Sequence, residues 1–378
     1  MALRPGDELR QELIALFAAG AGPGAELTEE RFGALALRVF EHQFALNRPY
    51  GAYCRKRALT PATVDDWRRI PAVPTAAFKE VALVAGDASA ARVVFRTSGT
   101  TRGMERRGAH HLLDPALYHA SLLAAFEACV LPDGARPALL SLIPSPAEVP
   151  DSSLSHMAGV LLERLGIAGS GWFSRAGSLD HAGLATALRR HEREGTPACL
   201  LGTSFAFVHW LDALQAQGER FALPPGSRLM DTGGYKGRSR DVDPGEMRRA
   251  YAERLGIPAS HQVNEYGMTE LLSQYYDAAL RDLVLDGPGE PRRKIGPPWL
   301  RALVTDPETL EPLPEGATGI LRHVDLANLD SVLAVQTEDL GTDVGDGFLL
   351  LGRAPGATPR GCSIAADLLL GALRDSPP

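Results

Sequence analysis

From about residue 92 to residue 255, short apolar runs alternate with longer amphipathic stretches, and this alternation constrains the fold more than any other feature. The apolar runs predict buried strands at 93–95, 138–143, 198–201 and 228–230. The longer stretches predict helices at 114–130, 153–165, 179–194, 204–217 and 244–255. Strands that alternate with helices form mostly parallel sheets flanked by helices. We therefore expect an α/β fold.

The two ends of the chain follow different patterns. Between residues 8 and 47, apolar residues recur at spacings of three and four, which predicts two helices separated by the glycine-rich residues 20–24. A third short helix is expected after Thr60-Pro61, because proline is tolerated in a first helical turn. Towards the C-terminus, strands with little helix between them are predicted at 319–321, 332–336 and 348–351. The expected organisation is a helical segment at 1–90, an α/β core at 91–285 and a smaller β-rich subdomain with a C-terminal tail at 286–378.

Composition excludes several classes of protein. The chain has 378 residues, 45% of them hydrophobic, and carries 39 Lys and Arg against 46 Asp and Glu, a net charge of −7. The basic residues are scattered, which argues against a nucleic-acid partner. No signal segment opens the chain and no apolar run approaches the ~18 residues that span a bilayer, so neither secretion nor membrane insertion is expected. Cysteines without a CxxC pair predict neither a disulfide framework nor a zinc site, and favour the reducing cytoplasm: Cys54, Cys129, Cys199 and Cys362.

A glycine- and hydroxyl-rich loop directly follows the apolar run at 93–95. It reads Arg-Thr-Ser-Gly-Thr-Thr-Arg-Gly over residues 96–103. Backbone N–H groups of such a loop and its hydroxyls can hold phosphate oxygens, although an ordinary turn after a strand has a similar composition. The loop does not meet the GxxxxGK[ST] form of the P-loop nucleotidases. A serine hydrolase is also disfavoured, because the nearest approach to GxSxG, at 202–206, lacks the last glycine.

A second motif, Asn-Glu-Tyr-Gly-Met-Thr-Glu at 264–270, places an aromatic residue, a glycine, a hydroxyl and a carboxylate close together. Two later segments follow in order, Gln-Thr-Glu-Asp-Leu-Gly at 336–341 and Gly-Arg at 352–353. Jointly the four motifs resemble those of the adenylate-forming superfamily, whose phosphate loop has the form SGTTG, whose adenine loop has the form YGxTE, and which carries a TGD motif. The resemblance implies that the chain adenylates a carboxylic acid, with ATP and Mg²⁺ as cofactors.

The resemblance also implies roles for individual residues. Four loop residues would hold the β- and γ-phosphates of ATP: Ser98, Gly99, Thr100 and Thr101. Thr269 would contact the α-phosphate, and Glu270 would bind Mg²⁺, a hard cation that suits one carboxylate together with phosphate oxygens. Taken singly, an acidic residue is more often a solvated surface charge.

The base and ribose of ATP would contact a second set of residues. Tyr266, next to Gly267 in the adenine loop, would stack on adenine, and Gly233 and Gly234 would lie against the other edge of the base. Asp339 would accept hydrogen bonds from the ribose hydroxyls. Arg353 would contact ribose or phosphate.

Further segments resemble the acyl-protein synthetase branch, typified by the fatty-acid ligase of bacterial luciferase systems: 44–54, 70–79, 152–157 and 360–362. This implies that a fatty acid is activated to an acyl-adenylate and passed through a cysteine thioester to a protein, such as a reductase or a carrier protein. Cys362 is the candidate, since the nearby Arg360 would lower its pKa and favour the thiolate. The alternative is an ordinary cysteine in a C-terminal loop. Cys129 and Cys199 lie in apolar patterns and are predicted to be core thiols.

Two departures from the superfamily leave other functions open. The sequence ends about 25 residues after Gly352-Arg353, so we expect no counterpart of the superfamily's usual mobile C-terminal domain and its lysine. Arg102 follows the phosphate loop, where members of the superfamily often have Lys-Gly after a short spacer. The alternatives are a ligase that transfers the acyl group to an amine, CoA or a carrier-protein thiol, and a non-catalytic nucleotide-binding homologue. His156 either lines the acyl pocket or lies on a helix surface, and His110 and His111 could help to neutralise the triphosphate.

Overall fold

The computed structural model describes residues 6–97, 107–233, 242–287, 291–354 and 360–374. The chain divides into two compact units. Unit 1 consists of Met1–Ala125, Met268–Gln274 and Lys294–Pro378, and unit 2 of Phe126–Gly267 and Tyr275–Arg293. The N-terminal and C-terminal parts of the chain therefore fold together in unit 1. The three-part division expected from the sequence stays a prediction.

Unit 2 contains the predicted α/β core. Its strands run in the order β11-β10-β9-β8-β4-β5, and all neighbours pair in parallel except β11, which is antiparallel to β10. The strands of this sheet are β4 (Ala138–Ser141), β5 (Gly171–Trp172), β8 (Ala198–Thr203), β9 (Arg228–Thr232), β10 (Gln262–Tyr266) and β11 (Tyr275–Asp277). The remaining elements are α5 (Ser153–Leu165), β6 (Ser174–Arg175), β7 (Ser178–Leu179), α6 (His181–Glu194), α7 (Ser204–Gln217), α8 (Pro244–Leu255), η5 (Ala259–His261) and α9 (Ala279–Val284).

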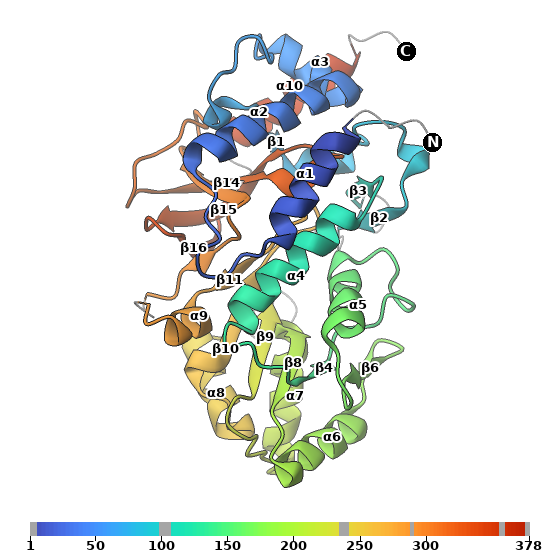
Figure 1. The fold of residues 1–378 in the computed structure, drawn as a ribbon, viewed down its shortest axis with the longest axis vertical. Helices are drawn as coiled ribbons and strands as arrows, with labels where there is room; N and C mark the ends of the chain where they lie inside the picture. The colour runs from blue at the N-terminus through green and yellow to red at the C-terminus, as the bar shows by residue number, and fades with distance from the viewer. Residues whose placement is uncertain (1–5, 98–106, 234–241, 288–290, 355–359, 375–378) are drawn as a thin grey trace. The chain divides into compact units, whose positions relative to one another are not determined.

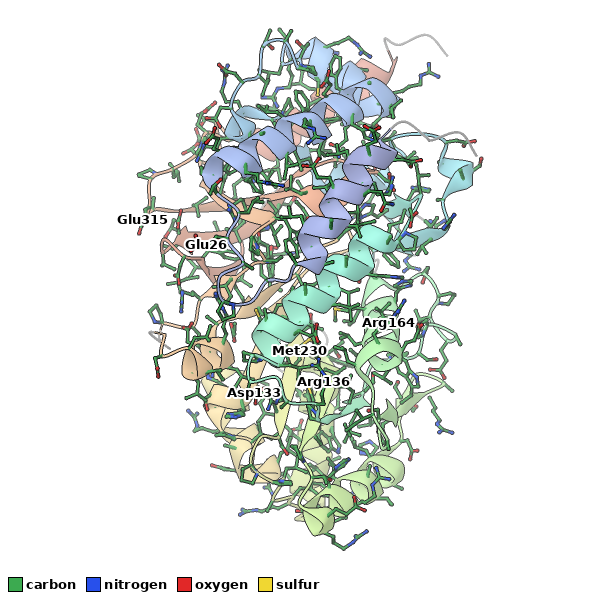
Figure 2. All side chains as sticks on the ribbon, viewed as in Figure 1. Glu26, Asp133, Arg136, Arg164, Met230 and Glu315 are labelled. Carbon is green, nitrogen blue, oxygen red and sulfur yellow. The ribbon has the colours of Figure 1, made fainter. Side chains whose placement is uncertain are left out.

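The core of unit 2 is formed where apolar strand residues meet helices α7 and α8. Leu200 and Leu229 from the sheet pack in one buried cluster with Phe207 and Trp210 of α7. Met230 of β9, labelled in Figure 2, is buried. Asp133, on the loop after α4, pairs with the fully buried Arg228 at 2.8 Å. The predicted core thiols of Cys129 and Cys199 are buried, and burial raises the pKa of each to about 12. Burial of this apolar surface is the main stabilising contribution to the unit.

Unit 1 contains the predicted β-rich part. Its strands run in the order β13-β14-β15-β16-β12 with antiparallel neighbours, and β1 pairs in parallel with β15. These strands are β1 (Val73–Pro74), β12 (Lys294–Ile295), β13 (Leu300–Thr305), β14 (Thr318–Asp325), β15 (Ala334–Asp343) and β16 (Phe348–Arg353). The helices are α1 (Asp7–Ala18), α2 (Glu29–Leu46), α3 (Arg48–Lys56), α4 (Ala116–Val130, of which unit 1 has residues 116–125) and α10 (Arg360–Arg374), with short turns η1 (Trp67–Arg69), η2 (Thr75–Lys79), η3 (Ala88–Ala90) and η6 (Leu326–Asn328).

The apolar run at 93–95 forms a strand, but not a member of the parallel sheet. β2 (Val93–Arg96) pairs antiparallel with β3 (Ala109–Leu112) in a separate two-stranded hairpin. Only Phe95 of the run is buried, whereas Val93 and Val94 are half-buried. The apolar run therefore resembled a sheet-core strand in composition but not in environment.

One helix prediction in unit 1 is corrected. The residues after Thr60-Pro61 form a turn, in which the Thr63 hydroxyl accepts from the Thr60 N–H at 2.9 Å and donates to the Ala58 carbonyl at 3.1 Å, so local hydrogen bonds replace a helix. The third helix is instead α3, where the Asn47 side chain caps the first turn. The tail predicted at the C-terminus forms α10, which contacts α3 although the two are far apart in sequence (Figure 1).

No helix among the residues that the structure describes is both long and apolar enough to cross a membrane.

A buried ion pair joins α1 to the loop before β15. Arg10 donates from both terminal nitrogens to the two carboxylate oxygens of Asp330, at 3.1 and 2.5 Å, and each side chain is only 6% exposed. Removing one partner of such a pair leaves the other charge buried without compensation.

We predict that Arg10→Met lowers the free energy of unfolding by about 3–5 kcal/mol, measured by urea denaturation. The matched control is Arg38→Met, which breaks the pair between Arg38 and Glu12, whose side chains are 49% and 36% exposed, and should cost less than about 1 kcal/mol. The double variant Arg10→Met/Asp330→Asn should recover part of the loss. Equal effects of Arg10→Met and Arg38→Met would contradict the assignment.

Candidate active site

The motif residues Thr269 and Glu270 lie in unit 1, on a segment whose backbone is held by buried side chains. We call residues 269–273 the anchored segment. The carboxylate of Asp325, fully buried at the end of β14, accepts from the N–H groups of Leu272 at 3.0 Å and Ser273 at 2.8 Å, and from the Ser273 hydroxyl at 2.7 Å. Burial raises the pKa of Asp325 although these hydrogen bonds act in the opposite direction. One carboxylate thus satisfies three donors of the segment.

A chain of hydroxyl groups extends this contact. Because Ser273 donates to Asp325, the Ser121 hydroxyl, 2.8 Å from the Ser273 oxygen, donates to Ser273. The Trp299 indole N–H in turn donates to Ser121 at 2.8 Å. Trp299, Ser121 and Ser273 are all buried, so each hydrogen bond polarises the next in a low-dielectric environment.

Two further side chains hold the carbonyl groups of the motif residues. The Asn328 amide donates to the Glu270 carbonyl at 2.9 Å, while its oxygen accepts from the Leu272 N–H at 3.1 Å. The ring Nδ1 of His110 lies 2.7 Å from the Thr269 carbonyl oxygen. The segment is therefore fixed on both sides of Glu270.

The side chain of Glu270 is 7% exposed. Burial raises the pKa of its carboxyl group to about 7, against the opposing influence of the nearby Lys79 and Arg353, while Asp339 adds to the rise. The protein alone therefore compensates the ionised carboxylate only in part, and a bound cation would add to that compensation. Among the described residues no group of three or more His, Cys, Asp or Glu could hold a metal ion. This donor set fits Mg²⁺ only as a partner of phosphate oxygens, which is the usual mode of binding.

The structure brings the predicted ribose-binding residues together in the same unit. Asp339 and Arg353 face each other in the register of β15 and β16, with Nε and Oδ1 3.8 Å apart. The Arg353 side chain is 75% exposed and that of Asp339 is 20% exposed. Both residues affect the pKa of Glu270, so these two motifs lie near the anchored segment.

Unit 2 carries the predicted adenine-binding residues at the carboxyl ends of neighbouring parallel strands. Thr232 pairs with Glu265, so Gly233 and Tyr266 follow at the same edge of the sheet. Gly233 has φ of 86°, which favours glycine, and its carbonyl accepts from the Ser204 hydroxyl at 3.0 Å. Tyr266 is half-buried beside Tyr275, and Gly267 follows it. Ser98, Gly99, Thr100, Thr101 and Gly234 lie outside the described residues.

The structure also identifies polar residues that the motifs do not contain. Asp231, at the end of β9, accepts from Tyr251 at 3.0 Å and from the Asn264 amide at 2.8 Å, and it is 3% exposed. The signal available in sequence was a charged residue at the end of an apolar run. The anchors Asp325 and Asn328 gave a similar signal, as polar residues within the apolar stretch 324–335.

The expected charge states of two residues are wrong. Cys362 is buried in the first turn of α10, and burial together with Glu338 raises the pKa of its thiol to about 11, with Arg322 acting in the opposite direction. Burial lowers the pKa of His110 to about 4, so this ring is neutral at physiological pH and adds no positive charge beside a triphosphate. The expectations from sequence considered only the neighbouring basic residue or loop and left out the effect of burial on the two pKa values.

The other two candidate histidines, His111 and His156, are less deeply buried than His110. Burial and the neighbouring Arg96 lower the pKa of His111. His156 is half-buried in α5, and its role stays a prediction.

Cys362 borders a cavity of about 230 Å³ in unit 1. The cavity is lined by Pro74, Thr75, Ala76, Gln336, Glu338, Cys362, Ser363, Ala366 and Asp367. The Cys362 thiol donates to the Thr337 carbonyl at 3.7 Å. The candidate nucleophile therefore contacts the strand that carries Asp339, a neighbourhood that the 25-residue separation of Cys362 and Thr337 concealed.

Known proteins resemble this chain in fold and sequence. A solved structure of 2-hydroxyisobutyryl-CoA ligase with 2-HIB-AMP, in the postadenylation state, matches 98% of this chain and 77% of its own length, with a TM-score of 0.61 and 16% identity. An open conformation of that ligase matches 95% and 82%, with a TM-score of 0.60 and 17% identity. These likenesses establish a shared fold.

Sequence relatives are more specific. The chain is 24% identical over 158 residues to the long-chain-fatty-acid–luciferin-component ligase of Vibrio harveyi, which is 41% of this chain and 38% of that protein. It is 25% identical over 146 residues to the protein of the same name from Aliivibrio fischeri, 38% of this chain and 35% of that protein. The matches thus span less than two fifths of each relative. The family model described as acyl-protein synthetase, LuxE, matches residues 170–368, more than half of the chain, and the chain belongs to this family.

Proposed function

We propose that this protein activates a carboxylic acid, most simply a fatty acid, by joining it to the α-phosphate of ATP. The observation that carries the proposal is Glu270, a buried carboxyl group on a segment held by hydrogen bonds, whose ionised form the protein compensates only in part. Membership of the acyl-protein synthetase family and the names of the two relatives support the choice of reaction and acid. Adenylation of this kind needs positioning and charge neutralisation more than covalent chemistry.

In the proposed reaction, a carboxylate oxygen of the acid attacks the α-phosphorus of ATP. The bond from that phosphorus to the bridging oxygen breaks, and pyrophosphate leaves with the electron pair. Mg²⁺, when bound, would neutralise charge on the phosphate oxygens. Glu270 would supply the protein's carboxylate for it, and the hydrogen bonds from His110 and Asn328 keep the backbone of Thr269 and Glu270 in place.

The second proposed step transfers the acyl group to Cys362. The sulfur attacks the acyl carbon, the bond to the AMP oxygen breaks, and the thiol proton passes to solvent as AMP leaves. The contact of Cys362 with Thr337, two residues before Asp339, supports this assignment because it ties the thiol to the ribose-binding strand. In the described arrangement Cys362 is 2% exposed and its thiol is protonated, so transfer requires the thiol to become more accessible and to lose its proton.

A protein such as a reductase or a carrier protein would accept the acyl group from Cys362. The description of the family, acyl-protein synthetase, supports a protein acceptor over a small amine or CoA.

Exchange of labelled pyrophosphate into ATP in the presence of a panel of carboxylic acids tests adenylation directly. We predict acid-dependent exchange that Glu270→Ala reduces at least about tenfold, equivalent to ~1.4 kcal/mol of barrier. The control is Glu315→Ala, an exposed glutamate of unit 1 labelled in Figure 2, which should retain wild-type exchange. Absence of exchange with every acid would refute the proposed function and favour a non-catalytic nucleotide-binding role.

The raised pKa of Glu270 also affects stability. Its folded-state pKa of about 7 exceeds the ordinary value of 4.5, so the folded state binds the proton more tightly. The resulting stability is fully present below about pH 4.5 and is lost as the pH rises through 7. At alkaline pH the ionised Glu270 thus lowers the free energy of unfolding of the unliganded protein.

We predict that Glu270→Gln stabilises the protein at pH 8.5 by on the order of 1–3 kcal/mol relative to wild type, with the gain shrinking towards pH 5. Urea denaturation at several pH values, without nucleotide or divalent cation, measures the difference. Glu315→Gln should show no such pH dependence. A Glu270→Gln variant that is less stable than wild type at pH 8.5 would show that the carboxylate is already compensated within the protein.

Cys362 is tested by covalent labelling. Incubation with ATP, Mg²⁺ and a labelled acid that supports exchange should leave a hydroxylamine-labile label on the protein, and Cys362→Ala should abolish the label while acid-dependent exchange persists. Ser363→Ala, at the neighbouring exposed position, is the matched control and should keep the label. Label retained by Cys362→Ala would exclude this thiol as the acyl acceptor.

A further inference from the structure

His110 is the buried polar side chain whose position the proposed chemistry leaves unexplained. It is 1% exposed, and its ring packs edge-on against Phe78 with ring centroids 5.7 Å apart. The Thr269 carbonyl oxygen, 2.7 Å from Nδ1, can only accept a hydrogen bond, so Nδ1 carries the proton and donates it. Nε2 is then a lone-pair acceptor, and it has no partner among the described residues. A neutral ring in this tautomer cannot donate to a phosphate oxygen from Nε2.

The place of His110 in the chain explains what its hydrogen bond achieves. It lies on β3, opposite Phe95 of β2, and the residues predicted to form the phosphate loop connect these two strands in sequence. The stem of this hairpin is closed by reciprocal contacts between Thr97 and Gly108: the Thr97 N–H donates to the Gly108 carbonyl at 3.0 Å, and the Gly108 N–H donates to the Thr97 hydroxyl at 2.9 Å. His110 therefore lies on a hydrogen-bonded hairpin, two residues after Gly108.

The partner of His110 is equally specific. The bond reaches the backbone of Thr269, immediately before Glu270, from a residue 159 positions away in the chain. Asn328 holds the Glu270 carbonyl on the other side. Within unit 1, His110 is thus the direct link between the hairpin that bears the phosphate-loop motif and the segment that bears the candidate metal ligand.

We propose that His110 is a positioning residue that couples the phosphate-loop hairpin to Glu270 through its hydrogen bond to the Thr269 carbonyl. This inference rests on the proposed function for its catalytic consequence. The hydrogen bond orients the backbone that presents the Glu270 carboxylate, so its loss leaves the carboxylate present but imprecisely placed. The expected result is weaker binding of the divalent cation, so that more of it is required, and unchanged recognition of the acid.

The variants separate the hydrogen bond from the volume of the ring. His110→Ala removes both, His110→Leu fills the space without a donor, and His110→Asn keeps an amide donor near the position of Nδ1. The matched control is His323→Leu, which removes an equally buried histidine of unit 1 that packs against Phe348. His110→Ala should lose the most stability because it leaves a cavity, whereas His110→Leu and this control should lose similar amounts.

The first readout is the Mg²⁺ concentration that gives half-maximal pyrophosphate exchange. We predict that it rises at least about fivefold in His110→Ala and His110→Leu, roughly 1 kcal/mol, while the KM of the acid changes less than about twofold. His110→Asn and His323→Leu should stay close to wild type. A wild-type Mg²⁺ requirement in His110→Leu would overturn the coupling to Glu270.

The second readout does not depend on activity. Peptide-level hydrogen exchange of the full-length protein without nucleotide should show faster exchange of the Leu272 and Ser273 amides in His110→Leu, by about tenfold, and wild-type protection in His110→Asn and His323→Leu. If wild type shows no pyrophosphate exchange, the proposed function fails and this measurement still decides the positioning role. Unchanged protection of the anchored segment in His110→Leu would overturn it. Should His110→Ala not fold, His110→Leu carries both tests.

Discussion

The carboxylate of Asp325 is the interaction on which the candidate site depends. It is buried, its pKa is raised by that burial, and yet it accepts from two backbone N–H groups and a hydroxyl of the anchored segment. A buried carboxylate is costly unless hydrogen bonds satisfy it, and the same rule makes each donor costly to leave unpaired. Asp325 and the segment therefore require each other. The hydrogen bonds from the anchored segment offset the cost of burying the Asp325 carboxylate, and they also restrict the backbone of that segment.

Glu270 shows why that rigidity matters. A flexible loop would let a buried carboxylate turn towards water or a surface lysine and recover its ordinary pKa. The hydrogen bonds that His110 and Asn328 donate to the carbonyls of residues 269 and 270 remove that option. The result is a carboxyl group with a pKa of about 7, poised between its neutral and charged forms. A pKa perturbed by burial in this way is more frequent at functional sites than elsewhere in proteins.

The sequence predicted regular elements best where local pattern and environment agree. The helices at 153–165 and 204–217 have the expected bounds because their cap residues, Ser152 and Thr203, mark their starts. Helix α10 was missed because glycines at 361 and 371 weaken its intrinsic propensity, and packing against α3 compensates for this. The residue types of the nucleotide-binding motifs could be recognised in the sequence, but the residues that hold the second motif in place, Asp325 and Asn328, could not. Asp325 and Asn328 contact residues 52 to 58 positions away, and no periodicity encodes such a pairing.

The position of Cys362 at the start of α10 determines both how its thiol is buried and how the thiol could become accessible. Packed with Leu310, Ile320 and Ala365, the thiol is protonated and inaccessible. It is, however, the third residue of α10, and the N–H groups of a first helical turn have no intrahelical partner, so opening this turn breaks fewer hydrogen bonds than opening a turn inside the helix. Such local opening would relieve the desolvation that raises the pKa of the thiol. Reactivity would then depend on the small free energy of fraying one turn, and the remainder of α10 could stay packed against α3.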